Sequence, residues 1–400
     1  MSSDFSSFMI GVIADDLTGG AELGAVGLRH GFQAEVVVEG QPSGEANLVC
    51  LDTNSRSCGP REAGRRAGRA ARLLRACGAR WIYKKVDSVL RGQVVAELEA
   101  VMPQLAVKRA LLVPANPALG RTISDGEYLI HGRLIHKTEF ARDAEYPRLS
   151  PRVLDLLEPA DHHPIRVGKV DGTLPTEGIV VGEAGTSADL RQWAAGWSPD
   201  QLPAGGAEFF SALLAAAGYK AMVTQPKRAS PPGAGPHLFV CGTLSQSGRD
   251  FIRQARKRGT PVFSLPRDLA RGGRMTPAAV EEISREAVAA LRVNPGVILH
   301  IGLPQVREPR AARSLATHLV RIAASVLRRG QVGQIYVEGG ATAIELVRRM
   351  GWDRLTVLRE VTPGVATLRV AAAPALCLTM KPGSYTWPEQ IRELACPTHP

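Results

Sequence analysis

The sequence predicts an α/β protein with two α/β domains, whose mostly parallel sheets face a shared cleft. The chain has 400 residues, which is more than one ordinary hydrophobic core contains. In both halves, short apolar runs rich in β-branched residues alternate with helical patterns, as in parallel sheets covered by helices. Residues 225–236, QPKRASPPGAGP, contain four prolines and no apolar periodicity, which is typical of a linker.

We therefore expect a first domain over residues 1–226, a linker over 227–236 and a second domain over 237–400. Ligands of such sheets bind beyond the carboxyl ends of the strands. Residues that directly follow a predicted strand are consequently the first candidates for chemistry.

The composition favours a globular protein with a small ligand. Hydrophobic residues make up 44% of the chain and charged residues 22%. The net charge of +11 is typical of some nucleic-acid-binding proteins, but the arginines are spread along the whole chain and no lysine-rich tail is present. We attribute most of this charge to coding bias, expect no nucleic-acid partner, and expect a small anionic ligand.

Targeting and metal signals are absent from the sequence. The N-terminus lacks the basic start and long apolar core of a signal peptide, and no apolar run reaches the ~18 residues that span a membrane. The six cysteines form neither a CxxC pair nor a Cys/His metal pattern. We expect a cytoplasmic protein with reduced thiols, no membrane partner and no metal held by the protein itself.

Apolar runs and helical periodicity define the elements in order. The predicted strands are 8–14, 34–39, 47–52, 80–86 and 109–115 in the first half, and 237–243, 260–265, 295–301, 333–339 and 375–380 in the second. The predicted helices are 60–78, 245–259, 276–292, 310–329 and 341–351. Residues 128–137 break the alternation, because two arms around His131-Gly132 predict a β-hairpin.

Charged residues follow three of the early strands. Asp15 and Asp16 follow the first strand, where one carboxylate could accept a hydroxyl proton; alternatively, one of them caps the next helix. Arg56 follows a second strand, and an arginine binds a carboxylate through two parallel bonds, although a loop arginine is often only solvated.

The segment YKKVDSVLRG (83–92) is the most charged of these strand ends. Lys84 and Lys85 point to opposite faces of a strand, so only one of them reaches the cleft. Asp87 lies where the strand ends, and Arg91-Gly92 is expected to open a helix whose free N–H groups bind an anion. The alternative is an ordinary strand-to-helix turn with Asp87 as its cap.

The connection after 109–115 is long enough to be a binding loop. It contains Arg121, His136 and Arg142, and His136 could equally be a hairpin residue without a ligand. In the second half, glycine-bearing loops at 241–248, 337–343, 362–365 and 381–388 could turn their N–H groups toward phosphate oxygens. None of these loops matches a Walker P-loop, and no GxGxxG motif supports a Rossmann site.

These motifs together resemble one family. IADDLTGG, TNSR, YKKVDSVLRG, PANPALGRT and GRLIHKTEFARD, followed by CGTLSQSG, EGGATA, TPGV and KPGSY, resemble the four-carbon acid sugar kinases over about residues 8–390. The resemblance implies an acid-sugar-binding first domain and a nucleotide-binding second domain. It also implies ATP-dependent phosphorylation of threonate, erythronate or 3-oxo-tetronate at the 4-hydroxyl. Phosphoryl transfer further implies Mg²⁺, bound mainly through phosphate oxygens and water.

The resemblance also implies the positions of the site. The substrate-binding candidates are Asp15, Asp16, Arg56, Lys84, Lys85, Val86 and Asp87, to which the charge argument adds Arg91. The nucleotide-binding candidates are Ser245, Gly340, Gly364, Lys381, Pro382, Gly383 and Ser384. We expect the basic residues to bind the substrate carboxylate. Asp87 and Asp16 are the catalytic candidates, which would orient the terminal hydroxyl and accept its proton.

The chain departs from the family on the nucleotide side. Where the family reads [ST]-G-G-[DE]-T, this sequence has Glu338 before the glycines and Ala341 after them, and Pro382 removes a backbone donor from the last loop. These departures motivate an alternative function, a non-catalytic or altered-specificity protein that binds an acidic metabolite and a nucleotide. A monomer and a homodimer are both compatible with the sequence.

Overall fold

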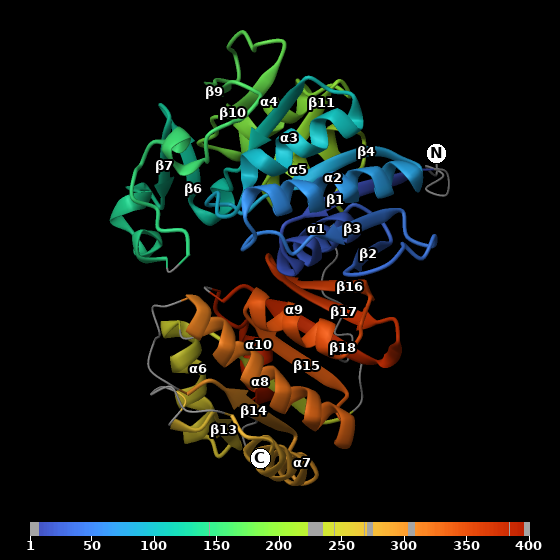
Figure 1. The fold of residues 1–400 in the computed structure, drawn as a ribbon, viewed down its shortest axis with the longest axis vertical. Coiled ribbons are helices and arrows are strands. Elements are labelled where there is room, and N and C mark those ends of the chain that lie inside the picture. The colour runs from blue at the N-terminus through green and yellow to red at the C-terminus, as the bar shows by residue number, and fades with distance from the viewer. Residues whose placement is uncertain are drawn as a thin grey trace. The chain divides into compact units, whose positions relative to one another are not determined.

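The computed structural model describes residues 8–143, 145–222, 235–243, 245–267, 269, 275–302, 309–383 and 385–395. The chain divides into two compact units, Met1–Thr224 and Gln225–Pro400. Each unit is described by itself (Figure 1). Residues 227–234 of the expected linker lie outside the described residues.

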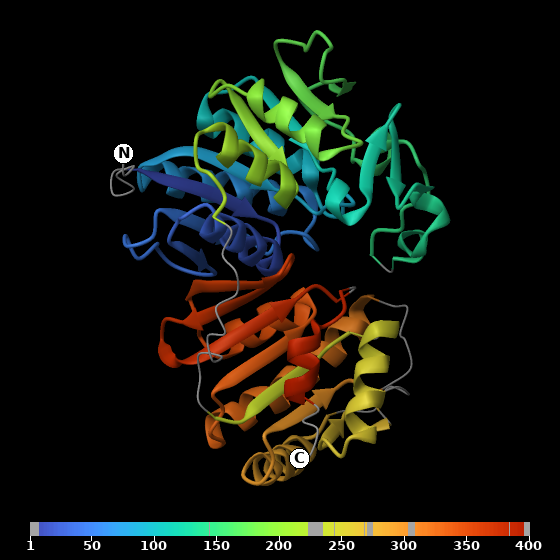
Figure 2. The same ribbon diagram turned by 180° about the vertical axis from the view of Figure 1, so that it is seen from behind.

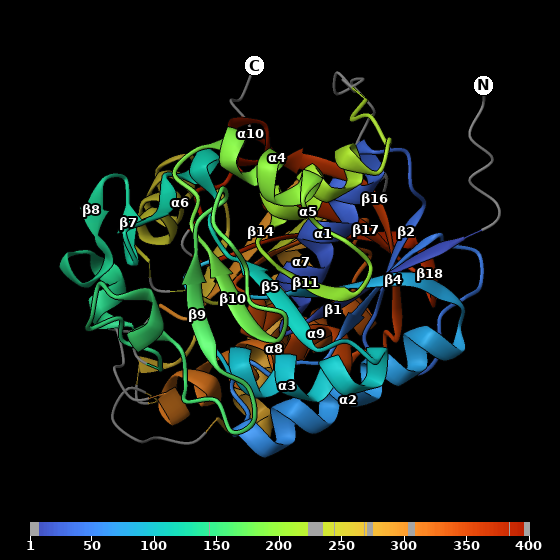
Figure 3. The same ribbon diagram turned by 90° about the horizontal axis from the view of Figure 1, so that it is seen from above.

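The first unit contains a parallel sheet with the strand order β2-β3-β1-β4-β11-β5-β10-β9. Its strands are β1 (Met9–Ala14), β2 (Ala34–Val37), β3 (Leu48–Asp52), β4 (Ala79–Lys85), β5 (Arg109–Val113), β9 (Ile165–Gly168), β10 (Gly178–Gly182) and β11 (Gln201–Gly205). Its helices are α1 (Leu17–Arg29), α2 (Pro60–Ala76), α3 (Val94–Leu105), α4 (Ser187–Ala195) and α5 (Ala207–Ala216). Helices α2 and α3 cover one face of the sheet, and α1, α4 and α5 cover the other (Figure 3).

Helices α2 and α3 pack closely because glycines line their contact. A Cβ atom on Gly64 would lie 3.0 Å from the carbonyl oxygen of Ala96, and one on Gly68 would lie 3.2 Å from that of Ala100. Beneath these helices, Leu74, Leu98 and many other apolar side chains form a continuous core against the sheet. Burial of this apolar surface is the main force that holds the helices on the sheet.

An insertion, residues 116–157, forms a small antiparallel sheet beside the main sheet (Figure 1). It contains β6 (Arg121–Ser124), β7 (Glu127–Ile130), β8 (Arg133–Leu134) and the 3₁₀ helices η2 (Pro117–Leu119), η3 (Ile135–Lys137), η4 (Glu139–Arg142) and η5 (Val153–Leu156). The predicted hairpin is present but shorter than expected: His131 and Gly132 connect β7 to β8 with φ angles of 49° and 74°, and residues 135–137 form η3 in place of the rest of the second arm. Two consecutive positive φ angles are the geometry of a tight hairpin turn.

The second unit contains a mixed sheet with the strand order β13-β14-β12-β15-β18-β17-β16; among its described strands β17 runs antiparallel to both neighbours, β18 and β16, and the other neighbouring pairs in this order are parallel. Its strands are β12 (His237–Cys241), β13 (Val262–Ser264), β14 (Gly296–His300), β15 (Gln334–Glu338), β16 (Arg354–Thr362), β17 (Val365–Val370) and β18 (Ala373–Lys381). Its helices are α6 (Gln246–Lys257), α7 (Pro277–Leu291), α8 (Pro309–Arg329), α9 (Gly340–Arg349) and α10 (Glu389–Ala395).

Helices cover both faces of this second sheet. Helices α8 and α9 lie on the face seen in Figure 1, and α6 and α10 lie on the face seen in Figure 2. On the α10 side, Phe239 and Tyr336 stack with their ring centroids 4.5 Å apart, and Trp387 meets Tyr336 edge-on. The predicted two-domain α/β class with mostly parallel sheets is therefore confirmed. No described helix is both long and apolar enough to cross a membrane.

The end of β11 provides a test of this packing. Gly205 has a φ of 151°, and a Cβ atom there would lie 2.0 Å from the carbonyl oxygen of Val113. We expect Gly205→Ala to lower the free energy of unfolding by about 2–5 kcal/mol, through backbone strain and overpacking. Urea denaturation followed by circular dichroism measures this change.

Gly196→Ala is the matched control. Gly196 has an ordinary φ of −85°, and its Cβ atom would meet its nearest neighbour at 3.6 Å. We expect the urea concentration at which half of the Gly196→Ala variant is unfolded to stay close to that of the unmodified protein. Equal midpoints for both variants would contradict the close approach of β11 to β5.

Candidate functional site

Three neighbouring strand ends bring acidic and basic side chains together in the first unit. Asp15 and Asp16 directly follow β1, Arg56 lies in the loop after β3, and Asp87 lies in the loop after β4. Because β3, β1 and β4 are adjacent and parallel, their carboxyl ends meet at one edge of the sheet. This is the edge at which the sequence predicted a site.

Arg56 pairs with all three of these aspartates. Its Nε and Nη2 donate to the two carboxylate oxygens of Asp15 at 2.6 and 3.0 Å, and its Nη1 donates to Oδ2 of Asp16 at 2.9 Å. The same Nη1 lies 3.8 Å from Oδ2 of Asp87. Burial alone would lower the pKa of Arg56, but the three carboxylates outweigh it and hold that pKa well above its usual value.

Asp87 is an ionised carboxylate held by a second arginine. Its Oδ1 and Oδ2 accept parallel bonds from Nε and Nη2 of Arg91, at 3.0 and 2.8 Å, and Oδ1 also accepts from the backbone N–H of Val89. Burial alone would raise the pKa of Asp87, but Arg91 and Arg56 outweigh it and hold that pKa well below its usual value. Arg91 donates further to Asp143 of the insertion at 3.1 Å.

Asp16 caps helix α1. Its Oδ1 accepts from the backbone N–H of Gly19 at 2.8 Å, and its Oδ2 accepts from the hydroxyl of Thr18 at 2.5 Å and from Arg56. The alternative expectation that one of the two aspartates is a helix cap is therefore confirmed. The carboxylate of Asp15 and the Oδ2 atom of Asp87 accept fewer hydrogen bonds than the carboxylate of Asp16. They therefore keep lone pairs that can accept from a ligand hydroxyl.

Lys84 and Lys85 point to opposite faces of β4, as expected. The ammonium of Lys84 is fully buried against α3, 2.8 Å from Oε2 of Glu97, and donates to the carbonyl of Lys85. The ammonium of Lys85 faces α1, where it lies 3.3 Å from Oε2 of Glu22 and donates to the carbonyl of Val86. Lys85 is therefore the lysine on the side of the aspartates. Lys84 lies on the opposite face of β4, where its pair with Glu97 stabilises the end of the strand.

The expected anion site at the start of α3 is corrected by the structure. The helix begins at Val94 and not at Arg91-Gly92. Its free N–H groups on Val95 and Ala96 donate to Oε1 of Glu158 at 2.6 and 3.1 Å. A carboxylate of the chain itself therefore occupies this helix N-terminus, which removes it as a substrate-binding position.

The insertion is fastened to this edge through main-chain carbonyls. Three of its side chains donate to carbonyl oxygens in the loops after β3 and β4: Tyr128 to Ser88, Tyr146 to Arg56, and Arg148 to Leu90. Sequence patterns did not identify these contacts, nor the roles of Glu22, Glu97 and Asp143. Asp143 and the three docking residues belong to the insertion, which is distant in sequence from the loops they contact, and the partners of Glu22 and Glu97 depend on how α1 and α3 pack on β4, so local spacing carried no signal for these contacts.

The glycine loops of the second unit converge in the same way. Strands β12, β15 and β18 are adjacent and parallel, so the loops that follow them share one edge. The turn at Gly364, with a φ of 79°, reaches this edge because β17 runs antiparallel to β18. Ser245 caps α6 by accepting from the N–H of Gly248 at 3.1 Å, and Gly340 is the first residue of α9. Ser384 lies outside the described residues.

Only glycine fits at several points where these loops meet. A Cβ atom on Gly242 would lie 1.8 Å from Oγ1 of Thr342, and one on Gly364 would lie 2.5 Å from the ring of Tyr385. A Cβ atom on Gly383 would lie 3.2 Å from Oγ1 of Thr243. The four loops therefore form one closely packed edge, at which a bound ligand can approach the backbone without meeting a Cβ atom.

Lys381 is paired inside this edge. Its ammonium lies 3.1 Å from Oε1 of Glu338, donates to the carbonyl of Tyr385 at 2.6 Å, and lies 5.2 Å from the centre of the Trp387 ring. Both charged side chains are almost completely buried. Burial lowers the pKa of Lys381 and raises that of Glu338, and their mutual attraction opposes both shifts. In this structure Lys381 stabilises the last loop, and a direct contact with phosphate stays a prediction.

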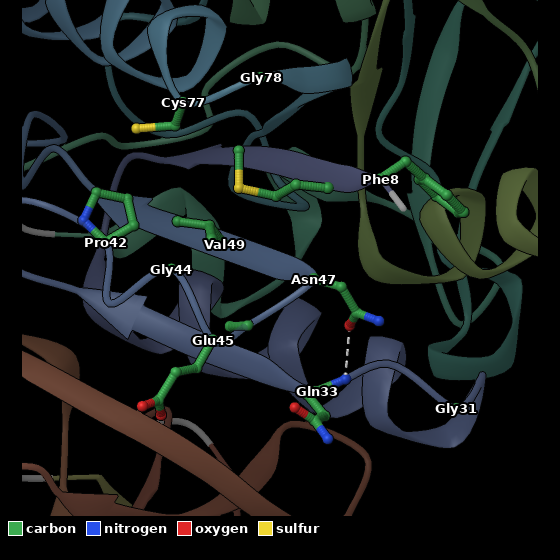
Figure 4. A pocket seen from close by; sticks show the side chains of 12 residues that line it. Phe8, Gly31, Gln33, Pro42, Gly44, Glu45, Asn47, Val49, Cys77 and Gly78 are labelled. Carbon is green, nitrogen blue, oxygen red and sulfur yellow. Dashed lines mark hydrogen bonds between the residues drawn. The ribbon is translucent and has the colours of Figure 1, made fainter. Parts of the chain in front are cut away.

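No group of three or more His, Cys, Asp or Glu side chains within the described ranges could hold a metal ion. A pocket of about 890 Å³ lies at the opposite, amino end of the first sheet, where Gly78, Asn47 and Phe8 line it (Figure 4). Its other lining residues include one charged side chain, Glu45, so it offers little to bind an anion.

Two family descriptions match the two units. Residues 10–213 match a family described as a sugar-binding N-terminal domain, and residues 238–385 match one described as a nucleotide-binding C-terminal domain. The first match covers the aspartate–arginine cluster, and the second covers the first three glycine loops and residues 381–385 of the fourth.

Similar proteins of known name align along nearly the whole chain. A D-threonate kinase of Cupriavidus necator is 29% identical over 94% of each chain, and a 3-oxo-tetronate kinase of the same organism is 26% identical over 96% of each. A D-erythronate kinase of Heliobacterium modesticaldum is 25% identical over 88% of each. A solved structure from Salmonella typhimurium, 19% identical, superimposes with a TM-score of 0.79 over 97% of this chain and 98% of that one, which shows a shared fold.

The buried pair of Lys84 and Glu97 provides a stability prediction. Lys84→Met leaves an unpaired buried carboxylate, so we expect it to lower the free energy of unfolding by about 3–5 kcal/mol. The double variant Lys84→Met/Glu97→Leu removes both charges and should recover most of that loss. Urea denaturation of the two single variants and the double variant measures the coupling; additive losses would show that the pair is not coupled.

The low pKa of Asp87 provides a pH prediction. Because this pKa is lower in the folded protein than the unfolded value of about 3.9, ionised Asp87 contributes stability above that pH, and the contribution is lost as the pH falls through the folded pKa. We expect Asp87→Asn to reduce the melting temperature at pH 7, and this difference should shrink below about pH 4. Asp125→Asn, at an exposed carboxylate, is the control and should change little.

Proposed function

The chain belongs to the four-carbon acid sugar kinase family, and on this premise we propose that it transfers the γ-phosphoryl group of ATP to the terminal hydroxyl of a four-carbon acid sugar. The substrate is of the threonate, erythronate or 3-oxo-tetronate type named for its relatives. The observation that carries this proposal is the cluster of Asp15, Asp16 and Asp87 around Arg56, within the residues that match a sugar-binding domain.

The two units have separate tasks in this proposal. The first binds the acid sugar, and the second binds ATP through the glycine loops around Gly242, Gly340, Gly364 and Gly383. Mg²⁺ would arrive on the phosphate oxygens and neutralise charge there, which requires few protein ligands. No nucleic-acid or membrane partner is proposed, and ATP as the phosphate donor agrees with a cytoplasmic location.

Asp87 is the residue that we propose to orient the terminal hydroxyl. In the reaction the substrate oxygen bonds to the γ-phosphorus, the bond from that phosphorus to the β–γ bridging oxygen breaks, and the hydroxyl proton passes to Oδ2 of Asp87. A carboxylate with a low pKa is a weak base, but phosphoryl transfer depends mainly on positioning and charge neutralisation. Asp16, the second catalytic candidate, is less suited because Gly19, Thr18 and Arg56 already use its oxygens.

A second candidate function has one observation in its favour. The buried pair of Glu338 and Lys381 turns the lysine away from solvent, and Pro382 lacks an N–H, so the nucleotide edge offers fewer donors than the family pattern. A protein that binds an acidic metabolite and a nucleotide without turnover agrees with this geometry. Release of ADP in the presence of four-carbon acids separates the two functions.

An activity assay tests the proposed function. With ATP, Mg²⁺ and a panel of threonate, erythronate and 3-oxo-tetronate, we expect ADP release with at least one acid. Asp87→Asn should reduce kcat by about 100-fold or more, because it removes a positioning contact, while thermal stabilisation by ATP persists. Asp125→Asn is the control with unchanged kcat. Full activity of Asp87→Asn would remove Asp87 from the mechanism, and binding of acid and ATP without ADP release would favour the second function.

A further inference from the structure

The arginines first expected to bind the substrate carboxylate are already engaged. Arg56 holds Asp15 through two bonds, and Arg91 holds Asp87 through two more. The ammonium of Lys84 is completely buried with Glu97, and that of Lys85 lies 3.3 Å from Oε2 of Glu22. An incoming carboxylate at any of these cations would compete with a carboxylate of the protein, so the site needs another cation to bind an anionic sugar.

Arg121 of the insertion supplies such a cation. Its Nη1 donates to the hydroxyl of Ser88, and its guanidinium lies 5.8 Å from the centre of the Phe140 ring. Within the described ranges it forms no ion pair with a carboxylate, and its side chain is only partly buried. A partly desolvated guanidinium without an acidic partner is well suited to bind a carboxylate through two parallel bonds.

The backbone around Arg121 is fixed before any ligand binds. Arg121 and Asn116 exchange two backbone hydrogen bonds of 3.0 and 2.8 Å across the short η2 turn. Gly120 has a φ of 65°, and a Cβ atom there would lie 2.2 Å from Nδ1 of His131, so this turn packs tightly against the hairpin. A preorganised arginine loses little conformational entropy on binding.

Ser88 connects Arg121 to the reacting end of the site. Its hydroxyl oxygen accepts from Arg121, and the hydroxyl hydrogen makes no bond in the described part of the chain, so it can donate to a ligand. Ser88 directly follows Asp87. Adjacent Cα atoms lie about 3.8 Å apart, which is of the same order as the length of a four-carbon chain.

We propose that Arg121 and Ser88 bind the carboxylate of the acid sugar while Asp87 orients the hydroxyl at its other end. This assignment rests on the proposed function and adds the residues that select an acid over a neutral sugar. It places the reactive carboxylates on the strand ends and the selecting arginine on the insertion. Arg121 and Ser88 would recognise the carboxylate of any short hydroxy acid in the same way. The experiment therefore compares four-carbon acids with a neutral analogue.

Steady-state kinetics of Arg121→Gln tests the proposal. We expect the KM for the preferred four-carbon acid to rise by about 10- to 100-fold, which corresponds to the loss of one or two charge-assisted bonds, while the KM for ATP is unchanged. The neutral four-carbon polyol should bind the variant as weakly as it binds the unmodified protein. Direct calorimetric titration of the acid without ATP provides a second measurement.

Matched variants make each outcome informative. Arg133→Gln removes the same charge from an exposed position of the same insertion and should leave the KM unchanged. Arg121→Lys keeps the positive charge but cannot make two parallel bonds, so its KM should lie between those of the unmodified protein and Arg121→Gln. Ser88→Ala should raise the KM less than Arg121→Gln does. If Arg121→Gln misfolds, as a changed melting temperature would show, Arg121→Lys and Ser88→Ala decide the matter.

The two proposals fail in different ways. If the unmodified protein phosphorylates none of the four-carbon acids, the proposed function is wrong. If it does so, and Arg121→Gln and Ser88→Ala keep the unmodified KM, only the assignment of the carboxylate site is wrong.

Discussion

The contact between Arg56 and three aspartates is the interaction on which the first unit depends. Three carboxylates at adjacent strand ends would repel one another if they were left unpaired in a buried setting. A single guanidinium, with donors in a planar fork, reaches Asp15 and Asp16 and lies near Asp87. Arg56 therefore links the loops that follow β1, β3 and β4, and the low pKa of Asp87 keeps that carboxylate ionised at neutral pH.

In the second unit, the loops at the carboxyl ends of the strands are held together mainly by close packing of the backbone and not by ion pairs. Its loops after β12, β15 and β18 pack so closely that Gly242 and Gly383 leave little or no room for a side chain. At this edge Lys381 pairs with Glu338 on the neighbouring strand, because a buried ammonium without a partner is costly.

The sequence predicted the alternation of strands and helices, and the charged residues that follow the strands, better than it predicted contacts between distant segments. Strands β1 and β3 are short and mostly apolar, and the residues after them come together at the candidate site because parallel strands end at one edge of the sheet. Strand β11 was missed because its sequence, QLPAG, contains Pro203 and Gly205, and only its position between β4 and β5 makes it a strand. The anion site expected at the start of α3 was wrong because Glu158, far along the chain, already accepts from the first free N–H groups of that helix.

The anchoring of the insertion has a consequence for how this protein can diverge. The insertion docks through hydrogen bonds that Tyr128, Tyr146 and Arg148 donate to main-chain carbonyl oxygens. Every amino acid has such an oxygen. These three docking bonds therefore do not depend on which side chains stand at positions 56, 88 and 90, although Arg56, Ser88 and Leu90 have other partners of their own. A change in the ligand-facing side chains of these loops would leave the same carbonyl acceptors in place for the insertion.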